Sequence, residues 1–163
     1  MTLRPATHCL FFPQVIYAEG ADDDRMVSRR IYGLLDLEVK SRVTLLEDDL
    51  DPRQLRKQIG EMDLFIGTRM HSNIFALSEG VKTLAIAYEP KTTGIMSGLH
   101  LQRYVCAMEE LDLAWLKESY LTIVRDDDYL PILEAGLQHF RQQAISDLKK
   151  NYTVRHGQSI TEQ

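Results

Sequence analysis

The sequence predicts an α/β fold in which a parallel sheet carries helices on both faces. Short apolar runs alternate with longer stretches whose apolar residues recur every three or four positions, as strands and amphipathic helices do. The run at residues 84–87 is apolar throughout, which is typical of a strand buried on both faces. No repeat or linker divides the chain of 163 residues. We therefore expect a single Rossmann-like domain over residues 1–151 and a frayed tail over residues 152–163.

The first half of the chain contains three expected strands and three expected helices. The strands are at residues 8–12, 43–46 and 63–67, and the helices are at 21–36, from 51 onward and at 70–79. Three aspartates, Asp22 to Asp24, begin the first helix, where carboxylates favour the positive end of the helix dipole. Asp51 is expected to cap the helix that begins there, with Pro52 as its first helical residue. Gly80 is expected to end the helix at 70–79, because glycine readily adopts the left-handed conformation found after a helix.

The second half continues the alternation. We expect strands at residues 83–88 and 104–106, and helices at 92–97, 111–120 and 126–151. Asp126 to Asp128 precede the last helix, and capping explains this acidic run better than a metal site does.

Composition excludes several classes of function. The net charge of −5 argues against a broad nucleic-acid surface. The two cysteines, Cys9 and Cys106, have no metal-ligand spacing and suit a reducing compartment. The apolar runs are too short to span a membrane, and no signal-peptide core is evident, so we expect a cytoplasmic protein without a transmembrane segment. No GxGxxG, P-loop, GxSxG or HExxH motif is present.

Ligands of open α/β sheets bind beyond the carboxyl ends of the strands, and the richest of these segments here is Gly67-Thr-Arg-Met-His-Ser72. Gly67 allows close approach to the backbone, and a helix start attracts anions. Arg69 offers a planar fork for a carboxylate or phosphate, and His71 can donate, accept or carry a proton. The alternative, in which Arg69 pairs with a structural carboxylate and His71 caps the turn, is about as well supported.

Two other strand ends carry charged groups. After the expected strand 83–88, Lys91 supplies a second positive charge, and Glu89 is either a base or the partner of Lys91; an ordinary surface turn is the alternative. Residues 47–49, Glu-Asp-Asp, follow another strand and have the chemistry to hold a sugar hydroxyl, although a solvated loop explains them better.

Residues 63–80 followed by 83–96 resemble the polysaccharide pyruvyl transferase family. The shared pattern is a strand, G-[TS]-R-[LM]-H-[SG], a helix ending in glycine, a strand, and Y-x-x-K, all in order here from Gly67 to Lys91. Looser similarity covers roughly residues 8 to 116. The resemblance implies transfer of pyruvyl from phosphoenolpyruvate to a glycan hydroxyl, within the C-terminal half of a GT-B-like fold. It gives His71 and Arg69 catalytic roles.

We expect the donor substrate to be bound by Gly67, Thr68, Met70, Ser72, Lys91, Glu89 and Arg25. The resemblance implies the role of Lys91 less strongly than those of His71 and Arg69, and that of Arg25, where the match is loose, less strongly still. The resemblance requires no cofactor or metal. It implies a glycan or lipid-linked saccharide acceptor, and a location peripheral to a membrane-bound glycan assembly. Family members are usually longer, with an N-terminal Rossmann-like domain. We therefore expect either a fragment of a longer enzyme or a short form that self-associates or needs a partner.

Two other functions stay open at this level. One is a GT-B-type glycosyltransferase half that binds a nucleotide sugar, although no clear ribose-binding glutamate pair is visible. The other is a non-catalytic binding or assembly module derived from the family.

Overall fold

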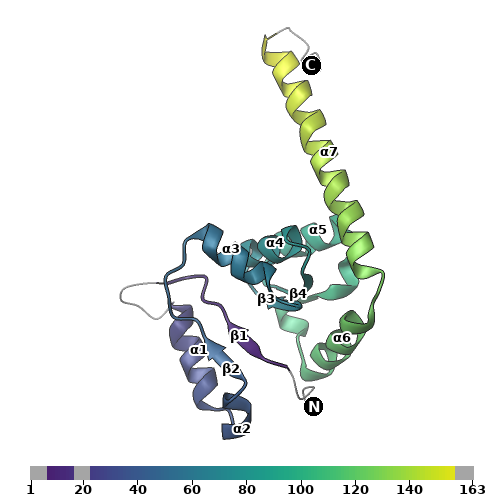
Figure 1. Cartoon of the computed structure of the whole chain (residues 1–163). Coiled ribbons are helices and arrows are strands. Elements are labelled where there is room, and N and C mark those ends of the chain that lie inside the picture. Colours follow the sequence, from purple (N-terminus) through teal and green to yellow (C-terminus); the bar gives the residue numbers. More distant parts are fainter. Residues whose placement is uncertain (1–6, 17–22, 157–163) are drawn as a thin grey trace. The chain divides into compact units, whose positions relative to one another are not determined.

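The computed structural model describes residues 7–16 and 23–156, with side chains as far as residue 150, and confirms the α/β class (Figure 1). The chain divides into two compact units, residues 1–55 and 56–163, and α3 (Pro52–Gly60) runs through the boundary. Each unit holds its own parallel sheet. The single domain expected over residues 1–151 stays a prediction.

The first unit contains a two-stranded sheet of β1 (Cys9–Phe11) and β2 (Val43–Leu45). Between the strands lie α1 (Asp24–Gly33) and a short α2 (Leu37–Lys40), which the sequence did not predict. Asp23 accepts a hydrogen bond from the backbone N–H of Arg25 and caps α1. Asp22, also expected at this helix start, lies outside the described residues. As expected, Asp51 precedes α3, and its carboxylate accepts from the N–H groups of residues 53 and 54.

The second unit is built on a three-stranded sheet in the order β3 (Leu64–Gly67), β4 (Lys82–Ala87), β5 (Val105–Ala107). The crossovers are α4 (Met70–Ser78) and α5 (Pro90–Gly98). They lie on one side of the sheet, and α6 (Leu113–Arg125) lies on the other (Figure 1). As expected, α4 is followed by Gly80, whose φ of 77° is the left-handed conformation of a helix stop.

The last helix, α7 (Tyr129–His156), begins inside the core of the second unit. Its backbone continues through residues 152–156, part of the expected frayed tail; residues 157–163 lie outside the described residues. Two short 3-10 turns, Gln102–Tyr104 and Met108–Glu110, flank β5.

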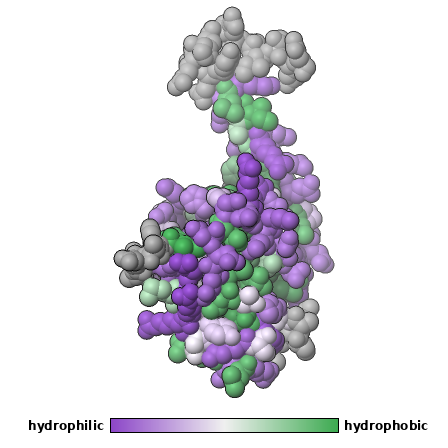
Figure 2. Space-filling model, turned by 60° about the vertical axis from the view of Figure 1, so that its left-hand side comes forward, coloured by the Kyte–Doolittle hydropathy of each residue, from purple (hydrophilic) through white to green (hydrophobic). Residues whose placement is uncertain are grey.

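The core of the second unit gathers apolar side chains from β4, α4, α5, α6 and α7. Its fully or nearly fully buried members are Leu77, Leu84, Ala85, Met96, Leu99, Leu101, Tyr104, Ile123, Tyr129 and Leu133. The first unit buries fewer apolar side chains, and α1 has none that is buried. Hydrophobic side chains therefore also reach the surface among hydrophilic ones (Figure 2).

Tyr129 fastens α7 to β4 through its phenol group. The hydroxyl accepts a hydrogen bond from the N–H of Thr83 at 2.9 Å and donates one to the Thr83 carbonyl at 3.2 Å. Both residues are fully buried. We expect Tyr129→Phe to lower the free energy of unfolding by about 1–3 kcal/mol, because a buried N–H loses its acceptor. Urea unfolding followed by circular dichroism measures this, and an unchanged midpoint would contradict it.

Alkaline pH should weaken the same region. Burial raises the pKa of Tyr129 to about 12 and, together with a hydrogen bond to Asp126, that of Tyr104 to about 12 as well. Each folded pKa lies above the unfolded value of about 10. The resulting stabilisation is complete below about pH 10 and is lost as the pH rises toward about 12.

We therefore expect the free energy of unfolding to fall between about pH 10 and pH 12. The fall should be smaller in Tyr129→Phe. Tyr88→Phe removes an exposed phenol and should keep the whole fall. Equal pH dependence of wild type and Tyr129→Phe in urea titrations would refute this account.

Candidate active site

The motif residues meet at one edge of the three-stranded sheet. Strands β3 and β4 are parallel, with Gly67 opposite Ala85, so their carboxyl ends lie at the same edge. Thr68 and Arg69 connect β3 to α4, and Tyr88 and Glu89 connect β4 to α5. The two helices also contact each other. The fold thus brings the Arg69–His71 segment and the Lys91 segment to neighbouring turns, as the sequence predicts.

Helices α4 and α5 begin differently from α1, α3 and α6, whereas the four-residue α2 also has no side-chain capping bond. Asp23 caps α1, Asp51 caps α3 and Asp112 caps α6 through side-chain hydrogen bonds to backbone N–H groups. In the part of the chain that the structure describes, Arg69 and Glu89 make no such capping bond to α4 and α5. Neither helix has an acidic residue in its first turn. The positive dipole ends of both helices are therefore available to an anion, and α4 also offers its first N–H groups; α5 offers fewer, because Pro90 has no N–H and the N–H of Thr92 donates to the Glu89 carbonyl.

The polar side chains of this edge divide into exposed and buried groups. Thr68, His71, Glu89 and Lys91 are exposed, whereas Arg69 and Met70 are half-buried. The hydroxyl of Ser72 is buried and donates to the Arg69 carbonyl at 2.8 Å. Ser72 therefore holds the start of α4, and the exposed groups, together with the backbone, are the ones that a ligand can reach.

Gly67 and Asn73 hold the turn between β3 and α4. The Asn73 amide, 2% exposed, donates from Nδ2 to the Gly67 carbonyl at 3.3 Å. A Cβ atom at position 67 would lie 2.1 Å from Asn73 Oδ1 and 2.5 Å from Phe65 Cε1, so only glycine fits. No motif in the sequence assigns a role to Asn73. Its only signal is an amide among the apolar residues of α4.

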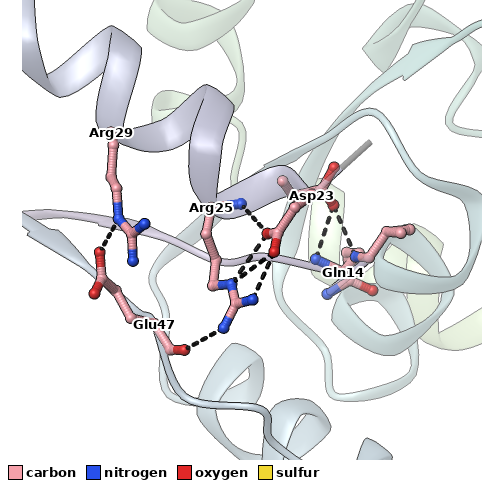
Figure 3. Close-up of polar contacts among 7 residues, drawn as sticks. Gln14, Asp23, Arg25, Arg29 and Glu47 are labelled. Carbon is pink, nitrogen blue, oxygen red and sulfur yellow. Dashed lines mark hydrogen bonds and ion pairs between the residues drawn. The ribbon is translucent and has the colours of Figure 1, made fainter. Parts of the chain in front are cut away.

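Arg25, the predicted ligand with the loosest match, lies in the first unit and is engaged by a carboxylate. It forms an ion pair with Asp23 at 2.6 Å and donates to the Glu47 carbonyl at 3.4 Å (Figure 3). The hydrogen bond to Asp23 raises the pKa of Arg25 above its ordinary value. Beside it, the hydrogen bond from Arg29 lowers the pKa of Glu47. Arg25 thus orders the start of α1, and its role toward a substrate stays a prediction.

The described residues also form two hollows, and neither is lined by the motif. An open groove of about 670 Å³ follows α6, where Arg103, Lys117 and Arg125 stand beside Glu118 and Asp126. A smaller hollow of about 180 Å³ lies at the ends of β1 and β2.

Among the described residues, no three His, Cys, Asp or Glu side chains gather as metal ligands. In the same part of the chain, no helix has both the length and the apolar character needed to cross a membrane.

The second unit is thus an α/β unit with a G-T-R-M-H-S turn beside a lysine-bearing turn. Comparison with family models is specific: the polysaccharide pyruvyl transferase model matches residues 9–90. The chain belongs to this family.

Among curated proteins, the amylovoran biosynthesis protein AmsJ of Erwinia amylovora is 33% identical over 89 residues. The aligned stretch covers 55% of this chain and 21% of AmsJ, so the chain spans only a small part of that relative. No solved structure matches the chain significantly.

Proposed function

We propose that this chain carries the donor-binding part of a polysaccharide pyruvyl transferase, which moves the pyruvyl group of phosphoenolpyruvate to a glycan hydroxyl. The observation that carries the proposal is the pair of uncapped helix starts at one sheet edge, with Arg69 and Lys91 beside them. Phosphoenolpyruvate carries a phosphate and a carboxylate close together. The N–H groups at the start of α4, the positive dipole ends of α4 and α5, and two cationic side chains match that pair of anions.

The chemistry assigns each group a task. Ketal formation needs a proton on the methylene carbon, a bond from an acceptor hydroxyl oxygen to the central carbon, and departure of phosphate as a second hydroxyl oxygen bonds to the same carbon. Exposed His71 is suited either to deliver the proton or to stabilise the leaving phosphate. Arg69 would hold an anionic group of the donor. Glu89 is suited to accept the proton of an attacking hydroxyl or to position Lys91. The donor is a substrate, and the proposed reaction uses no cofactor.

The proposed setting follows from the family and the relative. AmsJ is named for amylovoran biosynthesis, so we propose a role in exopolysaccharide or cell-wall polymer biosynthesis. The acceptor would be a glycan or a lipid-linked saccharide, handled in the cytoplasm beside a membrane-bound assembly. Exposed apolar residues on α1, such as Val27 and Ile31, provide a surface that a second copy or another domain would cover.

Isothermal titration calorimetry tests the proposed function. Phosphoenolpyruvate, pyruvate, inorganic phosphate and a uridine-diphosphate sugar are titrated separately into the chain. We expect saturable binding of phosphoenolpyruvate that is tighter than binding of pyruvate or phosphate, because only the donor presents both anions. Binding of the nucleotide sugar alone would identify a glycosyltransferase half instead. Binding of none of them by the folded chain would favour a non-catalytic module.

A further inference from the structure

The outer half of α7 is exposed to solvent. The helix begins in the core of the second unit, where Tyr129 and Leu133 are buried, and continues beyond the other helices of that unit (Figure 1). Every residue from Gln138 to Leu148 is exposed, including Ile145 at 54% and Leu148 at 69%. Isolated helices are only marginally stable in water, because packing supplies most of the stability of helices in proteins. The outer half of α7 is therefore suited to pack against another helix.

One row of side chains on α7 has the spacing of a coiled-coil seam. The core-facing residues of this helix are Tyr129, Leu133 and Gly136, all of them buried. A separate row follows in alternating steps of four and three positions, which is the spacing that keeps a row of side chains against a partner helix. This row, the α7 seam, consists of Leu130, Glu134, Leu137, Arg141, Ala144 and Leu148. All of its members are exposed except Leu137, which is partly buried.

The charges of the α7 seam favour one direction of pairing. Glu134 and Arg141 are two turns apart, about 10 Å along the axis, which is too far for an ion pair within one helix. Among the described residues, neither forms an ion pair or a side-chain hydrogen bond. If two seams ran in parallel, Glu134 would face Glu134 and Arg141 would face Arg141, which is repulsive. An antiparallel arrangement avoids this repulsion.

In the antiparallel arrangement the seam is complementary to itself. Leu130 of one copy then lies opposite Leu148 of the other. Glu134 lies opposite the small Ala144, and Arg141 of the second copy occupies the next layer, within reach of Glu134. The pairing thus has a leucine layer at each end and two reciprocal ion pairs between these layers.

We propose that the α7 seam pairs antiparallel with the seam of a second copy of this chain, so that the chain forms a symmetric dimer. The leucine layers exclude water, and the ion pairs set the direction and register. Charged residues in the inner layers make such a seam less stable than an apolar one, so the dimer dissociates reversibly. The seam contains no motif residue, and the proposal is independent of the donor assignment. Variants along the seam, those of Arg141 included, should therefore leave donor binding unchanged.

Sedimentation equilibrium of the full chain at several concentrations tests the self-association. We expect a monomer–dimer equilibrium. Leu148→Glu should weaken the dimer at least about tenfold, because it places a carboxylate in both end layers. Leu113→Glu is the matched control, since Leu113 on α6 is 64% exposed and lies outside the seam, and it should dimerise like the wild type. A chain that stays monomeric at every concentration, or a folded Leu148→Glu variant that dimerises like the wild type, would overturn the proposal.

Charge exchange and cross-linking test the direction of the pairing. Glu134→Arg and Arg141→Glu should each weaken the dimer about tenfold, because both ion pairs become repulsive, and the double variant should restore it. In a Cys9→Ser background, which removes a free cysteine, a short bis-maleimide should link Leu130→Cys chains to Leu148→Cys chains when the two are mixed. It should link Leu148→Cys chains to each other far less. Preferred links between Leu148→Cys chains, or no recovery in the double charge variant, would contradict antiparallel pairing.

Discussion

Replacing Gly67 by alanine is expected to destabilise the second unit by about 3 kcal/mol, the upper end of what overpacking a core produces. The new Cβ would lie 2.1 Å from Asn73 Oδ1 and 2.5 Å from Phe65 Cε1, both far inside van der Waals contact. Gly67 is buried at the end of β3, so neither neighbour can move into solvent without opening the turn. The strand-to-helix turn that presents Arg69 and His71 should be displaced with it. Urea unfolding and phosphoenolpyruvate titration measure the two effects.

Two further variants separate the steric cause from a general effect of alanine. Gly94→Ala adds the same methyl group within α5, where nothing lies within 4 Å, and should be neutral or stabilising by up to about 1 kcal/mol. The double variant Gly67→Ala/Asn73→Ala removes the closer of the two overlaps. It should be less destabilised than the sum of the single variants. Simple additivity, or a Gly67→Ala variant as stable as Gly94→Ala, would contradict the packing described here.

The second large effect concerns activity. In the complete transferase, His71→Ala should lower the rate of pyruvyl transfer by about 10²–10⁴-fold, whether the imidazole supplies a proton or stabilises the leaving phosphate. Arg69→Ala should cause a loss of similar size and should also weaken donor binding. His71 is exposed, so its removal should change the free energy of unfolding by no more than about 0.5 kcal/mol. Phosphate release and unfolding midpoints are the two measurements.

The two proposed roles of His71 predict different effects of His71→Gln. The glutamine amide can donate a hydrogen bond to the leaving phosphate but cannot deliver a proton, so partial activity would favour the phosphate-stabilising role and a loss as large as that of His71→Ala would favour the proton donor. Arg141→Ala, which removes an exposed arginine on α7, is the matched control for Arg69→Ala and should transfer at the wild-type rate. Wild-type turnover by folded His71→Ala and Arg69→Ala variants would remove both residues from the mechanism.

Local signals predicted much of the fold. Capping, proline placement and apolar period depend on residues a few positions apart, so Asp51 before Pro52, the stop at Gly80 and the strand–helix alternation follow from the sequence. The division into two sheets and the four-residue α2 carry no such local signal.

Polar contacts between residues far apart in the sequence could not be predicted from local patterns either. The sequence interprets the acidic run at residues 126–128 as capping, and Asp126 does accept a hydrogen bond from the N–H of Asp128 just before α7. In the structure Asp126 also binds the side chains of Arg103 and Tyr104, more than twenty residues away, which no local pattern indicates. Burial opposes ionisation of Asp126, but these hydrogen bonds outweigh it and lower its pKa.

At the candidate site, too, the sequence predicted local features but not side-chain contacts. The motif spacing predicted that Arg69, His71 and Lys91 follow consecutive strands, because strand ends and helix starts are local features. The absence of side-chain caps at α4 and α5, the lock between Asn73 and Gly67, and the Arg25–Asp23 pair depend on side-chain geometry. Sequence patterns do not specify those contacts.

The central claim is that the two uncapped helix starts form the donor site, and an amide NMR titration with phosphoenolpyruvate tests it most directly. The account predicts saturable shifts of the backbone amides at residues 70–72 and 91–93, which are lost in Arg69→Ala and kept in Arg141→Ala. Amides at residues 141–148 of α7 should not move. Saturable shifts confined to other parts of the chain, or none at these two helix starts, would contradict the account.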